Sequence, residues 1–204
     1  MATPSVFVID DQQAVREALG EMLRVFGYRV EIYPSADAFL AANADLGPGC
    51  VVADVRMPGM DGIELVRELA RRGASLPVVL ISGHADVPMA VAAIKAGAED
   101  FIEKPVDDQS LLAAINRCLA RVFDQLTREQ SLEELRNRLE RLTRREAEVM
   151  DLVVEGFTSQ AIALRLGISQ RTVESYRVQV MDKMQAESVA VLVRQAIRLG
   201  RIAP

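Results

Sequence analysis

The chain has 204 residues, half of them apolar, and a formal net charge of −5, which is enough to bury well-formed cores and predicts two domains. Its two cysteines, Cys50 and Cys118, are too few and too far apart for a disulfide framework or a zinc site, so we expect reduced thiols. No apolar run approaches about 18 residues, and the N-terminus lacks a basic stretch followed by an apolar one. We therefore expect a cytosolic protein that does not bind membranes.

The charge is distributed unevenly along the chain. From Thr143 onward there are nine Lys and Arg against seven Asp and Glu, or +2, which leaves −7 for residues 1–142. The acidic first part suits a metal site. The mildly basic second part is compatible with binding to nucleic acid, although DNA-binding domains are typically more basic.

Four predicted strands in the first half of the chain are followed by polar side chains suited to phosphate chemistry. They are residues 5–9 before Asp10-Asp11, residues 50–53 before Asp54, residues 76–81 before Ser82, and residues 100–103 before Lys104-Pro105. In an open parallel α/β sheet, ligands bind beyond the carboxyl ends of the strands. Three acids, a hydroxyl and an ammonium group at that edge suit a hard divalent cation and a phosphoryl group.

The two acids at residues 10 and 11, taken alone, could simply cap a helix. Their combination with Asp54 and Lys104 favours a functional site, because carboxylates this concentrated repel one another unless a metal ion and a lysine compensate them. A cis bond between Lys104 and Pro105 could aim the ammonium inward, although cis bonds before proline are a minority.

Amphipathic helices alternate with these strands and with a fifth strand marked by Val30 and Ile32. The predicted helices cover residues 12–26, 35–43, 61–72, 87–96 and 107–126. Alternation of strands and helices predicts a parallel sheet with helices on both faces.

Residues 116–142 contain no Gly or Pro and carry frequent charges. Their apolar residues fall in two sets with spacings of three and four, and the frame slips between the sets: Leu119, Val122 and Leu126, then Leu132, Leu135, Leu139 and Leu142. This pattern predicts a long helix, either with an interrupted coiled-coil seam or as a solvated linker.

The last part of the chain reads as a set of short helices. Thr143 and Glu146 form a capping box, and the turn at residues 167–169 separates predicted helices at 159–166 and 170–183. Two helices joined by a tight turn containing glycine are the helix-turn-helix arrangement. A final helix is predicted at 187–199. Its residues Val191, Leu192 and Ile197 could pair two copies or pack within one domain.

The helix at residues 170–183 has two distinct faces at 100° per residue. Val173, Val180 and Met184 form a core stripe, with Tyr176 and Arg177 at its borders. The opposite face carries Arg171, Ser175, Val178 and Asp182, flanked by Glu174 and Gln179. DNA base edges would be contacted from that face.

The first 120 residues resemble the receiver domain of bacterial response regulators. The matching elements are Asp10-Asp11, residues 51–62 (VVADVRMPGMDG), Ser82-Gly83-His84 and residues 101–105 (FIEKP). The resemblance implies a flavodoxin-like, doubly wound five-stranded parallel sheet of order 2-1-3-4-5. It implies that Asp54 takes a phosphoryl group from the phosphohistidine of a sensor histidine kinase.

Further roles come from the same resemblance. Asp11, Asp54 and the backbone carbonyl of Arg56 would bind Mg²⁺, with Asp10 reaching the ion through water. Ser82 and Lys104 would hold the phosphoryl oxygens. Phe101 would turn inward as a switch, or be an ordinary core residue. The side chains of Arg56 and His84 could tune the lifetime of the phosphoryl group.

Residues 143–204 resemble the four-helix LuxR-type DNA-binding domain, and its combination with a receiver is similar to the FixJ subfamily. The resemblance and the helix faces together assign DNA contacts to Arg171, Thr172, Glu174, Ser175, Arg177, Val178 and Lys183. Ser159-Gln160 stands where the family often has Asn-Lys, and Tyr176 replaces a frequent His. The first departure removes an expected phosphate contact, so the resemblance implies the fold of this domain but not its DNA affinity or target sequence.

The expected organisation is a receiver at residues 1–120, a helical linker at 121–142 and the DNA-binding domain at 143–204. The expected function is phosphorylation-controlled regulation of transcription, with the kinase, promoter DNA, RNA polymerase and a second copy as partners. One rival is an aspartyl-phosphate phosphatase. Such enzymes commonly use an acid two residues after the nucleophile, where Arg56 cannot serve. A second rival is a signalling adaptor whose last domain binds protein.

Overall fold

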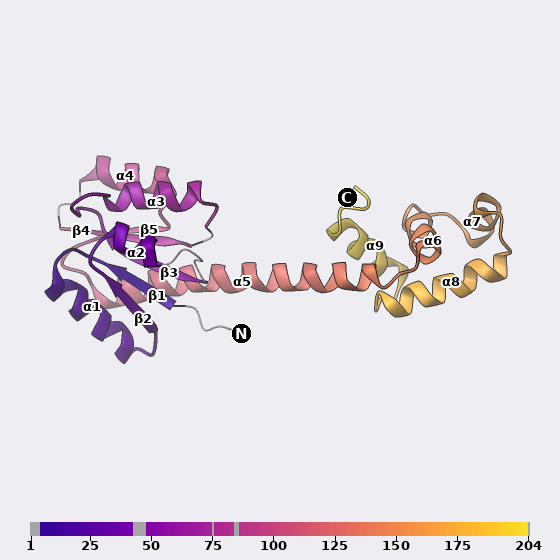
Figure 1. Cartoon of the computed structure of the whole chain (residues 1–204), viewed down its shortest axis with the longest axis horizontal. Coiled ribbons are helices and arrows are strands. Elements are labelled where there is room, and N and C mark those ends of the chain that lie inside the picture. Colours follow the sequence, from indigo (N-terminus) through magenta and orange to yellow (C-terminus); the bar gives the residue numbers. More distant parts are fainter. Residues whose placement is uncertain (1–4, 43–47, 75, 84–85, 204) are drawn as a thin grey trace. The chain divides into compact units, whose positions relative to one another are not determined.

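The computed structural model describes residues 5–42, 48–74, 76–83 and 86–203. The chain divides into two compact units, residues 1–125 and residues 126–204 (Figure 1). Among the described residues, no helix combines the length and the apolar character needed to span a membrane.

The first unit is built on a five-stranded parallel sheet of order β2-β1-β3-β4-β5. Its strands are β1 (Ser5–Ile9), β2 (Arg29–Tyr33), β3 (Gly49–Asp54), β4 (Val78–Ser82) and β5 (Asp100–Glu103). The predicted fold class and strand order are confirmed. The fourth strand was predicted to begin at Leu76 but begins at Val78, since Pro77 has no N–H to contribute to the ladder.

Helices cover both faces of this sheet (Figure 1). They are α1 (Gln13–Val25), α2 (Ala36–Ala42), α3 (Gly62–Arg71), α4 (Val87–Ala96) and α5 (Asp108–Glu140). Alternate residues of each strand enter two separate cores. Phe7 and Ile9 of β1 pack with α2, α3 and α4, whereas Val6 and Val8 pack with α1 and α5. Burial on both faces explains why the three central strands β1, β3 and β4 are almost entirely apolar, whereas β2 and β5 at the edges carry charged residues.

The long helix α5 explains the slip in the apolar pattern. Leu119 packs against the core between the sheet and α1, and Val122 is buried. Leu139 and Leu142, which follows the helix, pack against the core of the second unit. The two sets of apolar residues therefore serve two different cores, and a continuous frame between them is not required.

The second unit consists of α6 (Arg144–Val154), α7 (Ser159–Leu166), α8 (Gln170–Lys183) and α9 (Val189–Arg198) with the last part of α5. Each of these four helices begins after a Ser or Thr whose side chain accepts a backbone N–H of the first turn: Thr143, Thr158, Ser169 and Ser188. Such caps satisfy N–H groups that have no partner within the helix. Gly167 ends α7 with φ 66°, a left-handed conformation that glycine adopts without strain.

The core of the second unit contains the predicted stripe of α8. Val173, Val180 and Met184 are almost fully buried, and they pack with residues of α6, α7 and α9. On α9, Leu192 is 1% exposed in this same core. Of the two interpretations of the apolar face on α9, the structure supports packing within one domain.

Candidate functional site

The carboxyl ends of β1, β3 and β5 bring two acids and a lysine into contact. The Nζ atom of Lys104 donates to Oδ2 of Asp10 at 2.9 Å and to Oδ1 of Asp54 at 2.5 Å. Asp10 is fully buried and Asp54 is 5% exposed. Residues that are 94 and 50 positions apart in the sequence thus form one cluster at the strand edge where ligands bind in such sheets.

Backbone N–H groups hold the remaining carboxylate oxygens. Oδ1 of Asp10 accepts from the N–H of Gln12 at 2.9 Å, and Oδ2 of Asp54 accepts from the N–H of Arg56 at 2.7 Å. Every carboxylate oxygen of the two acids therefore has a donor, as buried polar groups require. Gly62 permits a close approach behind this site, because a Cβ there would lie 2.5 Å from the carbonyl oxygen of Asp54.

Lys104 carries its positive charge in this partly buried place. Burial by itself disfavours the ammonium form, but hydrogen bonds and charge from Asp54 and Asp10 outweigh that effect, and the pKa of Lys104 is raised above its ordinary value. The peptide bond between Lys104 and Pro105 is cis.

Asp11 and Arg56 are exposed beside this cluster. They line a groove of about 540 Å³ together with Val55, Met57, Pro58, Asp61, Ile63 and Met89. Within the described ranges, no three His, Cys, Asp or Glu side chains are gathered closely enough to hold a metal ion. To complete a metal site, the carboxylate of Asp11 would therefore have to turn inward from solvent.

The predicted switch residues lie on neighbouring strands. Ser82, at the end of β4, is 1% exposed, and its Oγ donates to Sδ of Met89 at 3.6 Å. Phe101 on β5 is half-buried and packs against the core that contains α3 and α4. The third candidate in this region, His84, lies outside the described residues.

Sequence reasoning missed two residues of this region. Arg16 on α1 donates from its guanidinium to the backbone carbonyl of Asp10 at 2.6 Å. Its position in the first turns after the acid pair was the available signal. Met89 lies in the first turn of α4, and nothing in the sequence indicated that its sulfur contacts Ser82.

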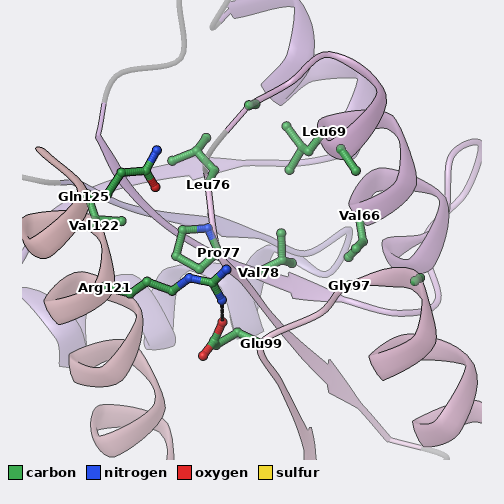
Figure 2. Close-up of a pocket in the computed structure, with 13 residues that line it drawn as sticks. Val66, Leu69, Leu76, Pro77, Val78, Gly97, Glu99, Arg121, Val122 and Gln125 are labelled. Atoms are coloured by element: carbon green, nitrogen blue, oxygen red, sulfur yellow. Dashed lines mark hydrogen bonds and ion pairs between the residues drawn. The ribbon is translucent and has the colours of Figure 1, made fainter. Parts of the chain in front are cut away.

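A second hollow lies at the opposite edge of the sheet. This cavity of about 180 Å³ is lined mainly by apolar residues at the ends of α3 and α4 and the start of β4 (Figure 2). Glu99 and Arg121 form an ion pair of 2.7 Å on its wall. It holds no cluster of acids like the one at the carboxyl ends of the strands.

On α8, four of the seven predicted DNA contacts are exposed: Arg171, Glu174, Ser175 and Val178. Val178 is 69% exposed although it is apolar. These residues lie on the face opposite the buried stripe, so the helix has the free surface that contact with a DNA groove requires.

The other three predicted DNA contacts, Thr172, Arg177 and Lys183, have hydrogen-bond partners within the second unit. Oγ1 of Thr172 lies 2.7 Å from Oγ of the capping residue Ser169, and Arg177 donates to Oγ of Ser159 at 3.4 Å. Lys183 donates to both carboxylate oxygens of Glu146, at 2.8 and 2.6 Å. The contacts of Arg177 and Lys183 connect α8 to α7 and α6, whereas that of Thr172 stays within the cap of α8; the sequence did not indicate these structural roles.

The parallel sheet, with two acids and a lysine at the ends of its strands, is typical of signalling domains that receive a phosphoryl group. In this chain it is joined to a helix-turn-helix unit. Comparison with protein families agrees. Residues 6–116 match the response regulator receiver domain, and residues 140–196 match bacterial regulatory proteins of the LuxR family.

Comparison with individual proteins shows which response regulators the chain is similar to in sequence and structure. The chain is 48% identical to the transcriptional regulatory protein FixJ of Azorhizobium caulinodans, over 98% of this chain and 94% of that protein. It is 42% identical to FixJ of Bradyrhizobium diazoefficiens, over 97% and 96%. Among solved structures, the response regulator StyR matches with a TM-score of 0.85 and 39% identity, over 96% of this chain and 98% of that one.

The chain therefore belongs to the response regulators that join a receiver domain to a LuxR-type DNA-binding domain, and within them it is FixJ-like. It is a phosphorylation-dependent transcriptional regulator. The predicted family and function are confirmed. The roles of individual site residues stay predictions.

Proposed function

We propose that Asp54 is the phosphoacceptor and that a sensor histidine kinase is the donor. An oxygen of the Asp54 carboxylate attacks phosphorus, the P–N bond to the kinase phosphohistidine breaks, and neutral imidazole leaves, because the other nitrogen of the ring already carries a proton. The observation that carries this proposal is the position of Asp54: it is buried, held by Lys104 and the N–H of Arg56, and adjacent to residues that line an open groove.

Lys104 would then exchange partners. The new phosphoryl group brings about −1.5 to −2 charges. The ammonium of Lys104, which now contacts both acids, would bind a phosphoryl oxygen, and the hydroxyl of Ser82 would bind another. The raised pKa of Lys104 supports this role, because the side chain stays charged throughout the physiological range.

The donor set fits Mg²⁺ in chemistry and charge. Asp10, Asp54 and Lys104 together carry a formal charge of −1, Asp11 adds another negative charge nearby, and all the available ligands are oxygens. Asp11, Asp54 and the carbonyl of Arg56 would hold the ion directly, and Asp10 through water. When bound, Mg²⁺ would offset the charge of the incoming phosphoryl group.

We expect Asp11→Ala to lose Mg²⁺ binding and phosphorylation together, because the remaining acids are already satisfied by Lys104 and backbone N–H groups. Calorimetric titration with Mg²⁺ and labelling by acetyl phosphate would measure the two losses. Glu17→Ala removes an acid on α1 and serves as the control. Normal labelling in excess chelator would contradict a metal requirement.

The proposed response to phosphorylation is dimerisation through α4 and β5. Val87, Val91 and Ile94 are 77%, 45% and 52% exposed, and their spacing places them on the same side of α4. Exposed apolar side chains grouped in this way often mark an interaction surface. Movement of Ser82 and Phe101 would reshape this face, because both lie on strands beside the helix.

The experiment that tests the whole function treats the full chain with acetyl phosphate and Mg²⁺. We expect one added phosphoryl group, a shift from monomer to dimer in sedimentation, and tighter DNA binding. To shift the ratio of the active to the inactive conformation from 1:99 to 99:1, phosphorylation must stabilise the active conformation by about 5.5 kcal/mol relative to the inactive one. Unchanged sedimentation after complete phosphorylation would exclude dimerisation, and transcription in vitro with purified RNA polymerase would test that partner.

The exposed face of α8 would contact DNA in the major groove, one helix for each half of an inverted repeat. We expect Arg171→Ala to weaken binding to all sequences, because its charge lies at the start of the helix near the phosphates. Val178→Lys should instead change sequence preference more than affinity for random DNA. Selection from random duplexes would measure both. Enrichment of single half-sites, or the absence of any enriched sequence, would contradict this arrangement.

Neither rival function has a specific observation in its favour. The residue two positions after Asp54 is Arg56, whose exposed guanidinium cannot act as a general acid or base at neutral pH. We therefore propose that the protein is not a phosphatase and that only slow phosphorylation from small donors and slow self-dephosphorylation occur. Salt-dependent DNA binding separates a regulator from an adaptor that binds protein.

A further inference from the structure

The hydroxyl of Ser82 is bound to a side chain of α4 in this structure. Its Oγ donates to the thioether sulfur of Met89 at 3.6 Å. Ser82 is 1% exposed, whereas Met89 is half-buried and lines the groove beside the site, so the contact lies at the border of the core. Thioether sulfur is a weak acceptor, but a buried hydroxyl benefits from any partner that replaces water.

This hydrogen bond competes with the contact proposed for the phosphorylated state. A serine hydroxyl has one proton to donate. While that proton is directed at the sulfur of Met89, it is not available to a phosphoryl oxygen on Asp54. The Ser82–Met89 bond therefore belongs to the unphosphorylated arrangement, and it favours that arrangement by the free energy of the bond.

Met89 also lies where a movement of the Ser82 hydroxyl would affect α4. It lies in the first turn of α4, where its backbone N–H donates to Oδ1 of the capping residue Asp86 at 2.7 Å. Its side chain packs against the core that contains α3 and lines the groove shared with Asp11 and Arg56. The same helix carries the exposed residues proposed to pair two copies.

We infer that Met89 is a positioning residue that restrains the switch. Its sulfur holds the Ser82 hydroxyl away from Asp54 and ties that hydroxyl to the first turn of α4. Phosphorylation of Asp54 breaks this bond, which removes one tie between Ser82 and the first turn of α4. This inference rests on the proposed role of Asp54 as phosphoacceptor.

Met89→Leu in the full chain tests the restraint, because leucine has nearly the same volume and no acceptor. A typical net hydrogen bond corresponds to about 2- to 10-fold in an equilibrium, and a bond to a weak sulfur acceptor corresponds to the low end, about 2-fold. We expect labelling by acetyl phosphate to be faster by about that factor, and the phosphorylated dimer to dissociate less readily by a similar factor. Met89→Gln supplies a stronger oxygen acceptor and should slow labelling.

Two controls distinguish the loss of the Ser82–Met89 hydrogen bond from a change in core packing as the cause of faster labelling. Met60→Leu makes the same substitution in the same core, on the loop after β3, and should leave the labelling rate unchanged. In a Ser82→Ala background, Met89→Leu should have no further effect, because the donor is already absent. An equal effect of Met89→Leu with and without Ser82 would show packing alone and overturn the inference.

The labelling rate and the oligomeric state also allow this inference to be tested separately from the proposed function. If the phosphorylated wild-type protein stays monomeric, dimerisation fails as the output, but the labelling rates still decide the role of Met89. If Asp54→Asn is labelled as well as wild type, the phosphoacceptor assignment fails first. If wild type is labelled at Asp54 and Met89→Leu is labelled at the wild-type rate, the restraint alone is excluded.

Discussion

Asp54→Asn should abolish the mass gain that acetyl phosphate and Mg²⁺ produce in the wild-type protein. The amide is neutral and is a far poorer nucleophile than the carboxylate. It also replaces an oxygen that accepts a hydrogen bond with an NH₂ group, either at Lys104 or at the N–H of Arg56. Intact-protein mass spectrometry after treatment measures the loss.

Asp61→Asn is the matched control for this change. Asp61 also lines the groove beside the site, but its carboxylate accepts the N–H of Glu64 at 2.7 Å and caps α3. Asparagine caps helices about as well as aspartate. The variant should therefore fold and be labelled like the wild type. Labelling retained in Asp54→Asn, or lost in Asp61→Asn, would contradict the assignment.

Lys183→Met should destabilise the second unit strongly. Glu146 is 2% exposed, and the ammonium of Lys183 lies within hydrogen-bond distance of both its carboxylate oxygens. Removing the lysine leaves a buried carboxylate without its cation. We expect a cost of about 3 kcal/mol, the low end for a broken buried pair, since Lys183 is partly exposed. Hydrogen exchange of α6 and α8 amides in the full chain measures it.

Glu146→Gln should cost less than Lys183→Met. Glutamine can still accept the backbone N–H of Thr143, and the ammonium left behind can reach water. Glu148→Gln is the surface control on the same helix, because Glu148 pairs with the exposed Arg144 and Arg145. It should change stability far less than Lys183→Met does, because the ion pairs of Glu148 are exposed to solvent. Equal losses in Glu146→Gln and Glu148→Gln would contradict a special role for the buried pair.

The same pair predicts a pH dependence. The hydrogen bond from Lys183 is the main reason why the pKa of Glu146 is lowered in the folded state. A lowered carboxyl pKa stabilises the fold fully above the pKa of glutamate in the unfolded chain, and this contribution is lost as the pH falls through the lowered value. The advantage of wild type over Lys183→Met should therefore be constant near neutral pH and shrink in acid.

Much of the receiver site was predictable, because strand ends are visible in the sequence. Predicted strands that stop at Asp54, at Asp10-Asp11 and before Lys104 have their carboxyl ends at a single common edge in a parallel sheet, so the meeting of these side chains follows from topology. The core stripe of α8 was predictable for a related reason. Helical periodicity by itself decides which residues share a face, and Val173, Val180 and Met184 are buried as that periodicity requires.

The tertiary structure decided which polar groups have partners within the protein. Lys183 was assigned to DNA from its helix position, yet its ammonium is held by Glu146, 37 residues earlier. The bond from Ser82 to Met89 depends on how α4 packs beside β4. Periodicity and strand ends specify the direction of a side chain from its own backbone. Its partner is set by the packing of separate elements, which no local pattern contains.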